Sequence, residues 1–302
     1  MKKIFGAAVV VLIVEVLARA ALGLGDPPLY IADPRVEYMA APGTYHRFGK
    51  LSAYNSFSMR SREVSAKKTD PDELRVLVIG DSVVNAGVQT DQSEVATTLL
   101  EERLRAHRPA FVGNVAAGSW GPPNMLAYVQ RFGFFDADVV VIVLNSGDEA
   151  DVPTFDVVDR HPDYPSVKPL LALEELVGRY GMRYMRGAFT KAGPPAAISP
   201  ADREAALGAL RELIRAAKPR HVIVAQHLGV SELGGHEEPG YFSIKSLAAS
   251  EAARVVTLPL QPPHYRDGIH TNAAGQKVIA DALTEEITKA LGLAPLTATR
   301  TQ

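Results

Sequence analysis

Five short runs of apolar residues alternate with longer amphipathic stretches along most of the chain. The runs cover residues 75–80, 111–117, 138–145, 221–226 and 254–260. Each run is apolar throughout rather than at every second position. Continuous hydrophobicity is typical of strands that are covered on both faces, and therefore of a parallel sheet. The pattern predicts about five parallel strands.

Helical patterns fill the intervals between these runs, near residues 92–107, 123–133, 201–217, 243–253 and 272–291. The last pattern places apolar residues at four-residue steps, with Asn272 as its N-cap. Asp91 and Glu94 have the spacing of a capping box at the start of the first. Strands that alternate with helices predict a three-layer α/β/α sandwich around a central, about five-stranded parallel sheet.

The remaining segments define the domain organisation. Residues 25–72 are rich in Pro, Tyr, Arg and Asp and show no long period, so we expect an extended lead-in that packs on the main domain. The main domain covers 73–295, and a proline-rich stretch at about 149–200 interrupts its alternation. We expect this insertion to form one wall of a binding cleft, and 296–302 to be a tail.

The N-terminal 1–24 predicts a targeting segment. Lys2 and Lys3 precede an apolar stretch that only Glu15 and Arg19 interrupt. Its uninterrupted core has the length of a signal-peptide core, whereas the whole stretch has about the 20 residues of one bilayer crossing. We favour an uncleaved membrane anchor over a cleaved signal peptide; a buried core helix is the alternative. Both favoured readings predict export, to the bacterial periplasm or cell surface.

Composition narrows the possible chemistry. The chain has 302 residues, no cysteine and a formal net charge of −2. Disulfides, thiolate zinc sites and a cysteine nucleophile are therefore excluded. No Lys/Arg block indicates a nucleic-acid partner.

Two short motifs supply candidate chemistry. Gly80-Asp81-Ser82 directly follows the first core strand, where a glycine turn can present the serine hydroxyl at the carboxyl edge of the sheet. Asp267 and His270 stand three apart, just before the last helix. A serine hydroxyl needs a base, and an imidazole acts best when a carboxylate orients it. Each motif alone is better explained as an ordinary turn, but together they predict a Ser-His-Asp triad.

This pair of motifs resembles the SGNH (GDSL-type) hydrolase family over roughly residues 74–292. The lead-in extends the resemblance, because "YNSFSMRSRE" (54–63) is similar to an N-x-x-G-x-R segment of exported bacterial members, with Ser58 at the usual glycine. The resemblance implies a flavodoxin-like SGNH hydrolase fold. It also implies that Ser82 is the nucleophile, His270 the base and then the acid, and Asp267 its orienter. No metal or other cofactor is implied.

Oxyanion donors follow from the same resemblance. They are the backbone N–H of Ser82, the N–H of a glycine in "NVAAGSWGPPN" (114–124), and an asparagine side chain. Gly118 matches the glycine better than Gly121. The asparagine block departs from the family pattern: "VLNSGDEAD" (143–151) carries Gly147 where asparagine is usual, and Asn145 lies two residues earlier. Asn145, or another donor, has to compensate.

Other polar and aromatic residues are secondary candidates for the cleft. Trp120 could stack on a sugar or acyl substrate or fill the core, and Asp81 is a turn-former that could also contact substrate. His264 and His227 could line the cleft, although a packed or solvated role is the favoured interpretation for each. The acidic residues between 148 and 151 could bind a metal, but neither a nearby histidine nor the triad calls for one.

Three functional hypotheses follow. The first is an exported serine esterase that hydrolyses ester-linked acyl groups, with acetyl favoured, on a small molecule or an acylated carbohydrate. The second uses the same triad for O-acetyl transfer to a cell-surface polysaccharide, as in similar membrane-tethered bacterial domains. The third is a binding protein that kept the fold and lost turnover, which the glycine at position 147 would suit.

Overall fold

The computed structural model describes residues 2–155, 164–181 and 198–294. Its centre is a five-stranded, all-parallel sheet in the order β6-β5-β7-β8-β9. The strands are β5 (Leu74–Gly80), β6 (Ala110–Ala116), β7 (Val139–Leu144), β8 (His221–Gln226) and β9 (Arg254–Thr257). The predicted fold class is confirmed, with strand ends shifted by one to three residues.

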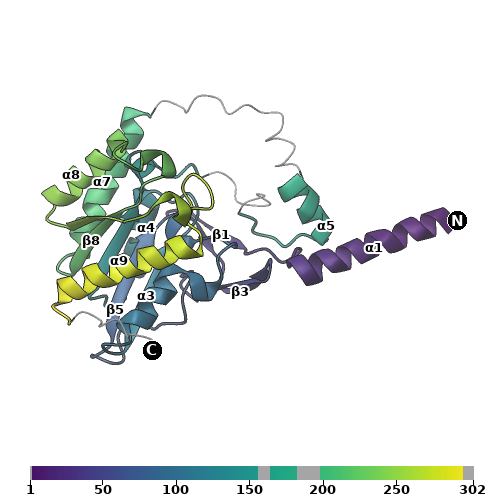
Figure 1. Cartoon of the computed structure of the whole chain (residues 1–302), viewed down its shortest axis with the longest axis horizontal. Coiled ribbons are helices and arrows are strands. Elements are labelled where there is room, and N and C mark those ends of the chain that lie inside the picture. Colours follow the sequence, from purple (N-terminus) through teal and green to yellow (C-terminus); the bar gives the residue numbers. More distant parts are fainter. Residues whose placement is uncertain (1, 156–163, 182–197, 295–302) are drawn as a thin grey trace.

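Helices cover both faces of this sheet (Figure 1). Apolar side chains of α4 (Pro122–Phe132), α7 (Pro200–Ala217) and α8 (Pro239–Ser250) form one core layer with the sheet. Those of α3 (Ala96–Leu104) and α9 (Ala273–Leu291) form the other. Since alternate strand residues enter the two layers, β7 is apolar at every position and β5 is apolar apart from the buried Arg75, in keeping with the continuous runs of the sequence.

The predicted helix caps are present. The Asn272 side chain accepts a hydrogen bond from the N–H of Gly275, 3.0 Å away, at the start of α9. Asp91 and Glu94 form the reciprocal capping box, but it opens the 3₁₀ turn η1 (Gln92–Glu94) just before α3. One predicted helix is therefore a short turn followed by a helix.

The lead-in is more regular than its sequence suggested. It contains two antiparallel hairpins, β1 (Tyr30–Asp33) with β2 (Glu37–Ala40) and β3 (Gly43–Arg47) with β4 (Lys50–Tyr54). It packs on the domain, because Tyr38, Met39 and Met59 enter the core layer formed with α4.

Arg60 joins the lead-in to the loop that follows the GDS motif. Its buried guanidinium donates hydrogen bonds to the carbonyl oxygens of Asn85 (2.6 Å), Gly87 (2.7 Å) and Thr90 (2.7 Å). Asn55 is the first residue, and Arg60 the last, of the segment that is similar to N-x-x-G-x-R. The side-chain oxygen of Asn55 accepts hydrogen bonds from the N–H groups of Phe57 and Met59. This lead-in segment therefore holds the loop that follows Ser82 in place.

Helix α1 (Lys2–Leu22) projects from the domain, and the short helix α5 (Ala172–Glu175) lies beside its C-terminal end (Figure 1). By length and composition, α1 is the one helix of the described residues that could cross a membrane. Helix α5 belongs to the predicted insertion. Residues 156–163 and 182–197 of this insertion, like the tail from residue 295, lie outside the described residues.

We expect Ser58→Gly to raise the free energy of unfolding by about 0.5–1 kcal/mol. Ser58 has φ +62°, a left-handed conformation that costs a side-chain-bearing residue about 1–2 kcal/mol. Part of this gain in stability is lost because glycine loses more conformational entropy on folding than serine does. Urea unfolding of the full chain measures the change.

Ser231→Gly is the matched control, because Ser231 is exposed and does not have a positive φ. It should lower stability by about 0.5–1 kcal/mol. A Ser58→Gly protein no more stable than wild type would contradict the assignment of strain to this turn.

Candidate active site

Ser82 directly follows the carboxyl end of the inner strand β5. Its neighbours β6 and β7 follow on either side of β5 in the sheet, so Ser82 sits at the point where the strand order reverses. Asp81 caps the one-turn helix α2 (Ser82–Asn85) by accepting the N–H of Val83 at 2.8 Å. This cap holds the serine at the first position of the turn.

His270 and Asp267 come from a tight loop before α9. The N–H of Arg266 donates to the carbonyl of His270 (2.9 Å), and Tyr265 pairs with Thr271 in an isolated β-bridge. Asp267 Oδ1 accepts the N–H groups of Ile269 (3.0 Å) and His270 (2.7 Å). Hydrogen bonds within the loop fix its backbone conformation, and this fixes the position from which the His270 side chain extends.

The three side chains meet in a chain of hydrogen bonds. His270 Nε2 lies 2.9 Å from Ser82 Oγ, and His270 Nδ1 lies 2.9 Å from Asp267 Oδ2. Partial burial raises the pKa of Asp267, but hydrogen bonds from two backbone N–H groups and the His270 ring outweigh it and lower the pKa to about 2. Asp267 is therefore charged at neutral pH and holds the proton of Nδ1, which leaves Nε2 to accept the proton of the serine hydroxyl.

Two backbone N–H groups are available beside the serine. Within the described parts of the chain, neither Ser82 N–H nor Gly118 N–H has a hydrogen-bond acceptor. Gly121, the alternative to Gly118, instead donates its N–H to Asn124 Oδ1 at 3.0 Å. These contacts favour Gly118 over Gly121 as an oxyanion donor.

Asn145 reaches the serine turn but is occupied there. Its Nδ2 donates to Asp81 Oδ2 and Asp148 Oδ2, both at 3.0 Å, and its Oδ1 accepts the N–H of Gly147 at 2.8 Å. Asn145 is the N-cap of the 3₁₀ turn η2 (Ser146–Glu149). The altered spacing of this block therefore makes the asparagine a bridge between two carboxyl groups.

Burial raises the pKa values of the two carboxyl groups that Asn145 bridges. It raises the pKa of Asp148 well above its usual range, and the nearby Asp81 raises it further. Burial also raises the pKa of Asp81, against hydrogen bonds from Val83 and Asn145. Among the described residues, no group of three or more acidic or imidazole side chains could hold a metal.

Two candidate substrate contacts are not placed in the cleft. The Trp120 side chain is 2% exposed, and its indole N–H donates to the carbonyl of Tyr38 at 3.0 Å. Its large apolar ring is satisfied in the core, which corrects the substrate-stacking alternative. Asp81 is likewise buried and fully used by Val83 and Asn145, so it forms the turn and does not face substrate.

The two secondary histidines have structural partners. His264 Nδ1 accepts the N–H of Gln261 (3.0 Å) and closes a local turn. His227 is fully buried at the end of β8, where its Nε2 lies 2.7 Å from the carbonyl of Ile269. Since a carbonyl only accepts, Nε2 carries the proton. His227 thereby supports the residue next to His270.

Gln276 is a positioning residue that the sequence interpretation missed. From the buried face of α9, its Nε2 donates to Thr271 Oγ1 (2.8 Å) and to the carbonyl of Val83 (3.1 Å). Its Oε1 accepts the N–H of Ala96 at 2.8 Å. One amide thus links the histidine loop to the serine turn. The available signal was a glutamine three residues before Ile279, on the apolar stripe of the helix.

A cavity of about 350 Å³ opens beside this site. It is lined by the turn after β7 and the start of α7, with the residues Asn145, Gly147, Asp148, Ala150, Asp151, Ile198, Ser199 and Asp202. Burial raises the pKa of Asp151 to about 6. Asn145 connects this cavity to Asp81 and so to the serine turn.

Comparisons with known proteins give fold neighbours only. No protein-family model and no curated protein matches the sequence. Among solved structures, the acetylxylan esterase Axe2 from Geobacillus stearothermophilus is similar, with 16% identity, 71% of this chain and 94% of that chain covered, and a TM-score of 0.45. The structure of TesA is also similar, with 19% identity, 72% of this chain and 99% of that chain covered, and a TM-score of 0.46.

A lipolytic protein of the G-D-S-L family from Veillonella parvula is a third, with 12% identity, 72% and 99% coverage and a TM-score of 0.44. These descriptions are of the class that the sequence motifs resemble. Since the identities and TM-scores are low, the function is argued below from the site itself.

We expect the fold to lose about 2 kcal/mol of stability between pH 7 and pH 5 because of His227. Burial lowers the pKa of this histidine to about 4, against about 6.5 in the unfolded chain. Between these values the unfolded state binds the extra proton, so stability is full above pH 6.5 and falls as the pH drops toward 4.

Urea unfolding of wild type and His227→Gln at both pH values measures this effect. The glutamine retains an N–H donor for Ile269 but does not titrate, so its loss of stability should be smaller. His236→Gln, at an exposed histidine, should behave as wild type. Equal pH dependence in all three proteins would rule out His227 as the source.

Proposed function

We propose that this protein is a membrane-anchored serine esterase of the SGNH type that hydrolyses ester-linked acyl groups. The observation that carries the proposal is the chain of two 2.9 Å contacts from Ser82 Oγ through the His270 ring to Asp267 Oδ2. The side chains of His270 and Asp267 are 31% and 50% exposed, so an ester can reach the site. The anchor is α1.

The chemistry follows from these positions. Ser82 Oγ attacks the ester carbonyl carbon while His270 Nε2 takes the hydroxyl proton, and Asp267 stabilises the imidazolium. The carbonyl oxygen becomes an oxyanion that the N–H groups of Ser82 and Gly118 bind. The intermediate collapses, His270 gives the proton to the leaving alcohol, and an acyl-serine remains. Water, deprotonated by His270, then releases the carboxylic acid and restores the serine hydroxyl.

The substrate class that we favour is an acetyl ester of an alcohol that carries several other hydroxyl groups. The cavity beside Asn145 is lined by carboxyl and hydroxyl side chains as well as apolar groups, and its polar side chains suit the hydroxyl groups of a carbohydrate. The same cavity supports the second hypothesis, O-acetyl transfer, because a bound sugar hydroxyl competes with water for the acyl-enzyme. Acetylated product from an acetyl donor and a glycan, rather than free acetate alone, distinguishes transfer.

We expect Ser82→Ala to abolish hydrolysis of 4-nitrophenyl acetate, with a loss of about 10³-fold or more in kcat/KM, since the nucleophile is removed. A fluorophosphonate probe should label wild type once per chain and leave Ser82→Ala unlabelled. Ser119→Ala is the matched control, because Ser119 lies in the neighbouring loop and contacts Tyr164 instead.

Retained activity in Ser82→Ala would refute the esterase mechanism. Failure of wild type to react with the probe would instead favour the hypothesis of a binding protein without turnover.

We expect Asp267→Asn to lower kcat by about 10²- to 10⁴-fold while the fold persists. The asparagine oxygen can still accept the loop N–H groups, but the amide cannot stabilise the imidazolium. Circular dichroism checks the fold, and kcat measured across neutral pH should fall at every pH. Asp72→Asn, at an exposed turn, serves as control. An unchanged kcat would remove Asp267 from the proposed triad.

A further inference from the structure

The C-terminal part of α1 is built into the domain. Glu15 Oε1 and Oε2 accept the N–H groups of Ala172 (2.8 Å) and Leu173 (3.0 Å) at the start of α5. Arg19 Nη2 donates to the carbonyl of Leu170 at 2.8 Å. Helix α5 is therefore held beside α1 at the level of Glu15.

A second set of contacts fixes the end of the helix. Arg47 of β3 donates to the carbonyl of Gly23 (2.8 Å) and forms a buried ion pair with Glu175 of α5. Glu175 Oε2 also accepts the N–H of Gly25 at 2.7 Å. The anchor, the β3–β4 hairpin and α5 thus form one unit, without a loose linker between anchor and domain.

The length of the free part of α1 has a consequence for its depth in a bilayer. The charged Lys2 and Lys3 keep one end of the apolar part of α1 at a headgroup layer, since charged side chains are costly in hydrocarbon. From there to Glu15 the 13 residues Lys2–Val14 extend about 20 Å at 1.5 Å per residue. The hydrocarbon core of a membrane is about 30 Å thick. If only this part entered the membrane, about 10 Å of hydrocarbon would be left uncrossed. The level of Glu15, and with it α5, therefore has to descend into the outer side of the bilayer.

The surface at that level is apolar. We call residues 164–181, which contain α5 and the π-helix η3 (Leu176–Gly181), the α5 segment. Leu170 is 88% exposed, Val177 61% and Leu171 52%, and on α1 the neighbouring Leu17 is 57% exposed. These side chains continue the apolar surface of the anchor beyond Glu15. Exposed leucines and valines gain when they enter the acyl boundary of a membrane.

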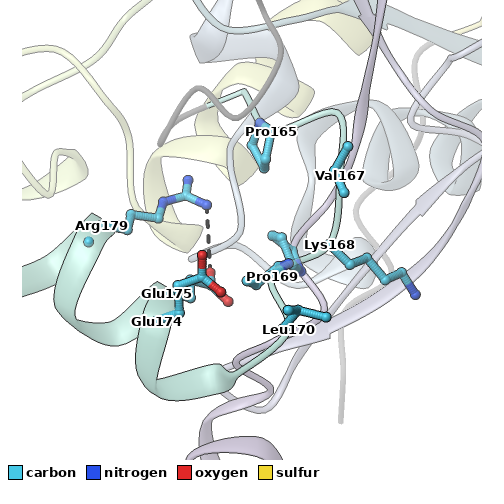
Figure 2. A pocket seen from close by; sticks show the side chains of 10 residues that line it. Pro165, Val167, Lys168, Pro169, Leu170, Glu174, Glu175 and Arg179 are labelled. Atoms are coloured by element: carbon cyan, nitrogen blue, oxygen red, sulfur yellow. Dashed lines mark ion pairs between the residues drawn. The ribbon is translucent and has the colours of Figure 1, made fainter.

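The remaining polar groups of the α5 segment are compatible with this position. A pocket of about 470 Å³ separates Arg179, which pairs with Glu175, from Val167 and Leu170 on the entering loop (Figure 2). Lys168 is paired with Asp26 at 2.6 Å. Lys168 and Arg179 are thus paired, and the exposed carboxylate of Glu174 is compatible with the headgroup layer but not with the hydrocarbon.

We propose that the α5 segment seats in the bilayer that α1 crosses, with Leu170, Leu171 and Val177 at the boundary between headgroups and acyl chains. The inference rests on the anchor of the proposed function and on no property of the triad. The occupant of this apolar surface is lipid, because the surface is continuous with that of the anchor and lies at a depth that the length of α1 sets.

The natural absence of cysteine allows a direct test. Single-cysteine variants Leu170→Cys and Val177→Cys of the full chain carry an NBD fluorophore and are reconstituted into vesicles of phosphatidylcholine and phosphatidylglycerol. Val10→Cys, in the middle of α1, reports the anchor. Phe242→Cys, an exposed apolar residue on α8, is the matched control outside the membrane.

Lipids with bromine near the headgroup end of the acyl chain should quench the fluorophore at 170 and 177, and lipids with bromine deep in the chain should quench it at 10. The fluorophore at 242 should be quenched by neither. Quenching at 10 but not at 170 or 177 overturns the inference and leaves the anchor intact. A blue shift at 170 without quenching would likewise overturn it, and would assign the surface to contact with a second copy of the chain. No quenching at 10 would refute the anchor itself, and the inference with it.

Discussion

An inner strand of the sheet, β5, is buried on both faces and so restricts where this protein can carry polar chemistry. Every residue of β5 is buried, between α4-side and α3-side core layers. Its first unhindered polar position is the carboxyl end, where the chain turns at Asp81 and exposes Ser82. The flanking strands β6 and β7 end at the same edge, so Gly118 and Asn145 arrive beside the serine as a result of parallel pairing.

The histidine loop reaches this edge from the other end of the chain, and buried polar contacts hold it there. Gln276 bridges it to the serine turn, His227 supports the carbonyl of Ile269, and Arg266 Nη1 donates to the carbonyl of Ala86 at 3.3 Å. Each is a partly or fully buried donor with a defined acceptor, for which a misplaced loop would leave an unpaired group. The precision of the site thus depends on residues that do not touch a substrate.

The sequence was informative where one local rule decides the outcome. Continuous apolar runs predicted the strands, and short polar side chains predicted the caps at Asp91 and Asn272. The four short strands of the lead-in were not predicted, because their burial is set by pairing and by contact with α4 rather than by alternation. Trp120 was ambiguous for a related reason, since only the position of the carbonyl of Tyr38 decides whether the indole faces the core.

The asparagine block shows the limit of reasoning by motif. Position in the sequence placed Asn145 too early, but the cap that it provides for η2 turns its amide back toward Asp81 and Asp148. Ser58 shows the opposite case. The departure from glycine was visible in the sequence, and the structure keeps the left-handed turn and accepts the strain.

The junction between α1 and the domain has a further consequence for selectivity. Gly23 and Gly25 are both hydrogen-bonded into the fold, so under the proposed anchoring by α1 no flexible linker would let the domain tilt or move away from the lipid surface. The active site would then be held at one distance from the membrane surface and in one orientation. Substrates would then be selected by where their esters pass in relation to the membrane, as well as by the shape of the pocket that receives them.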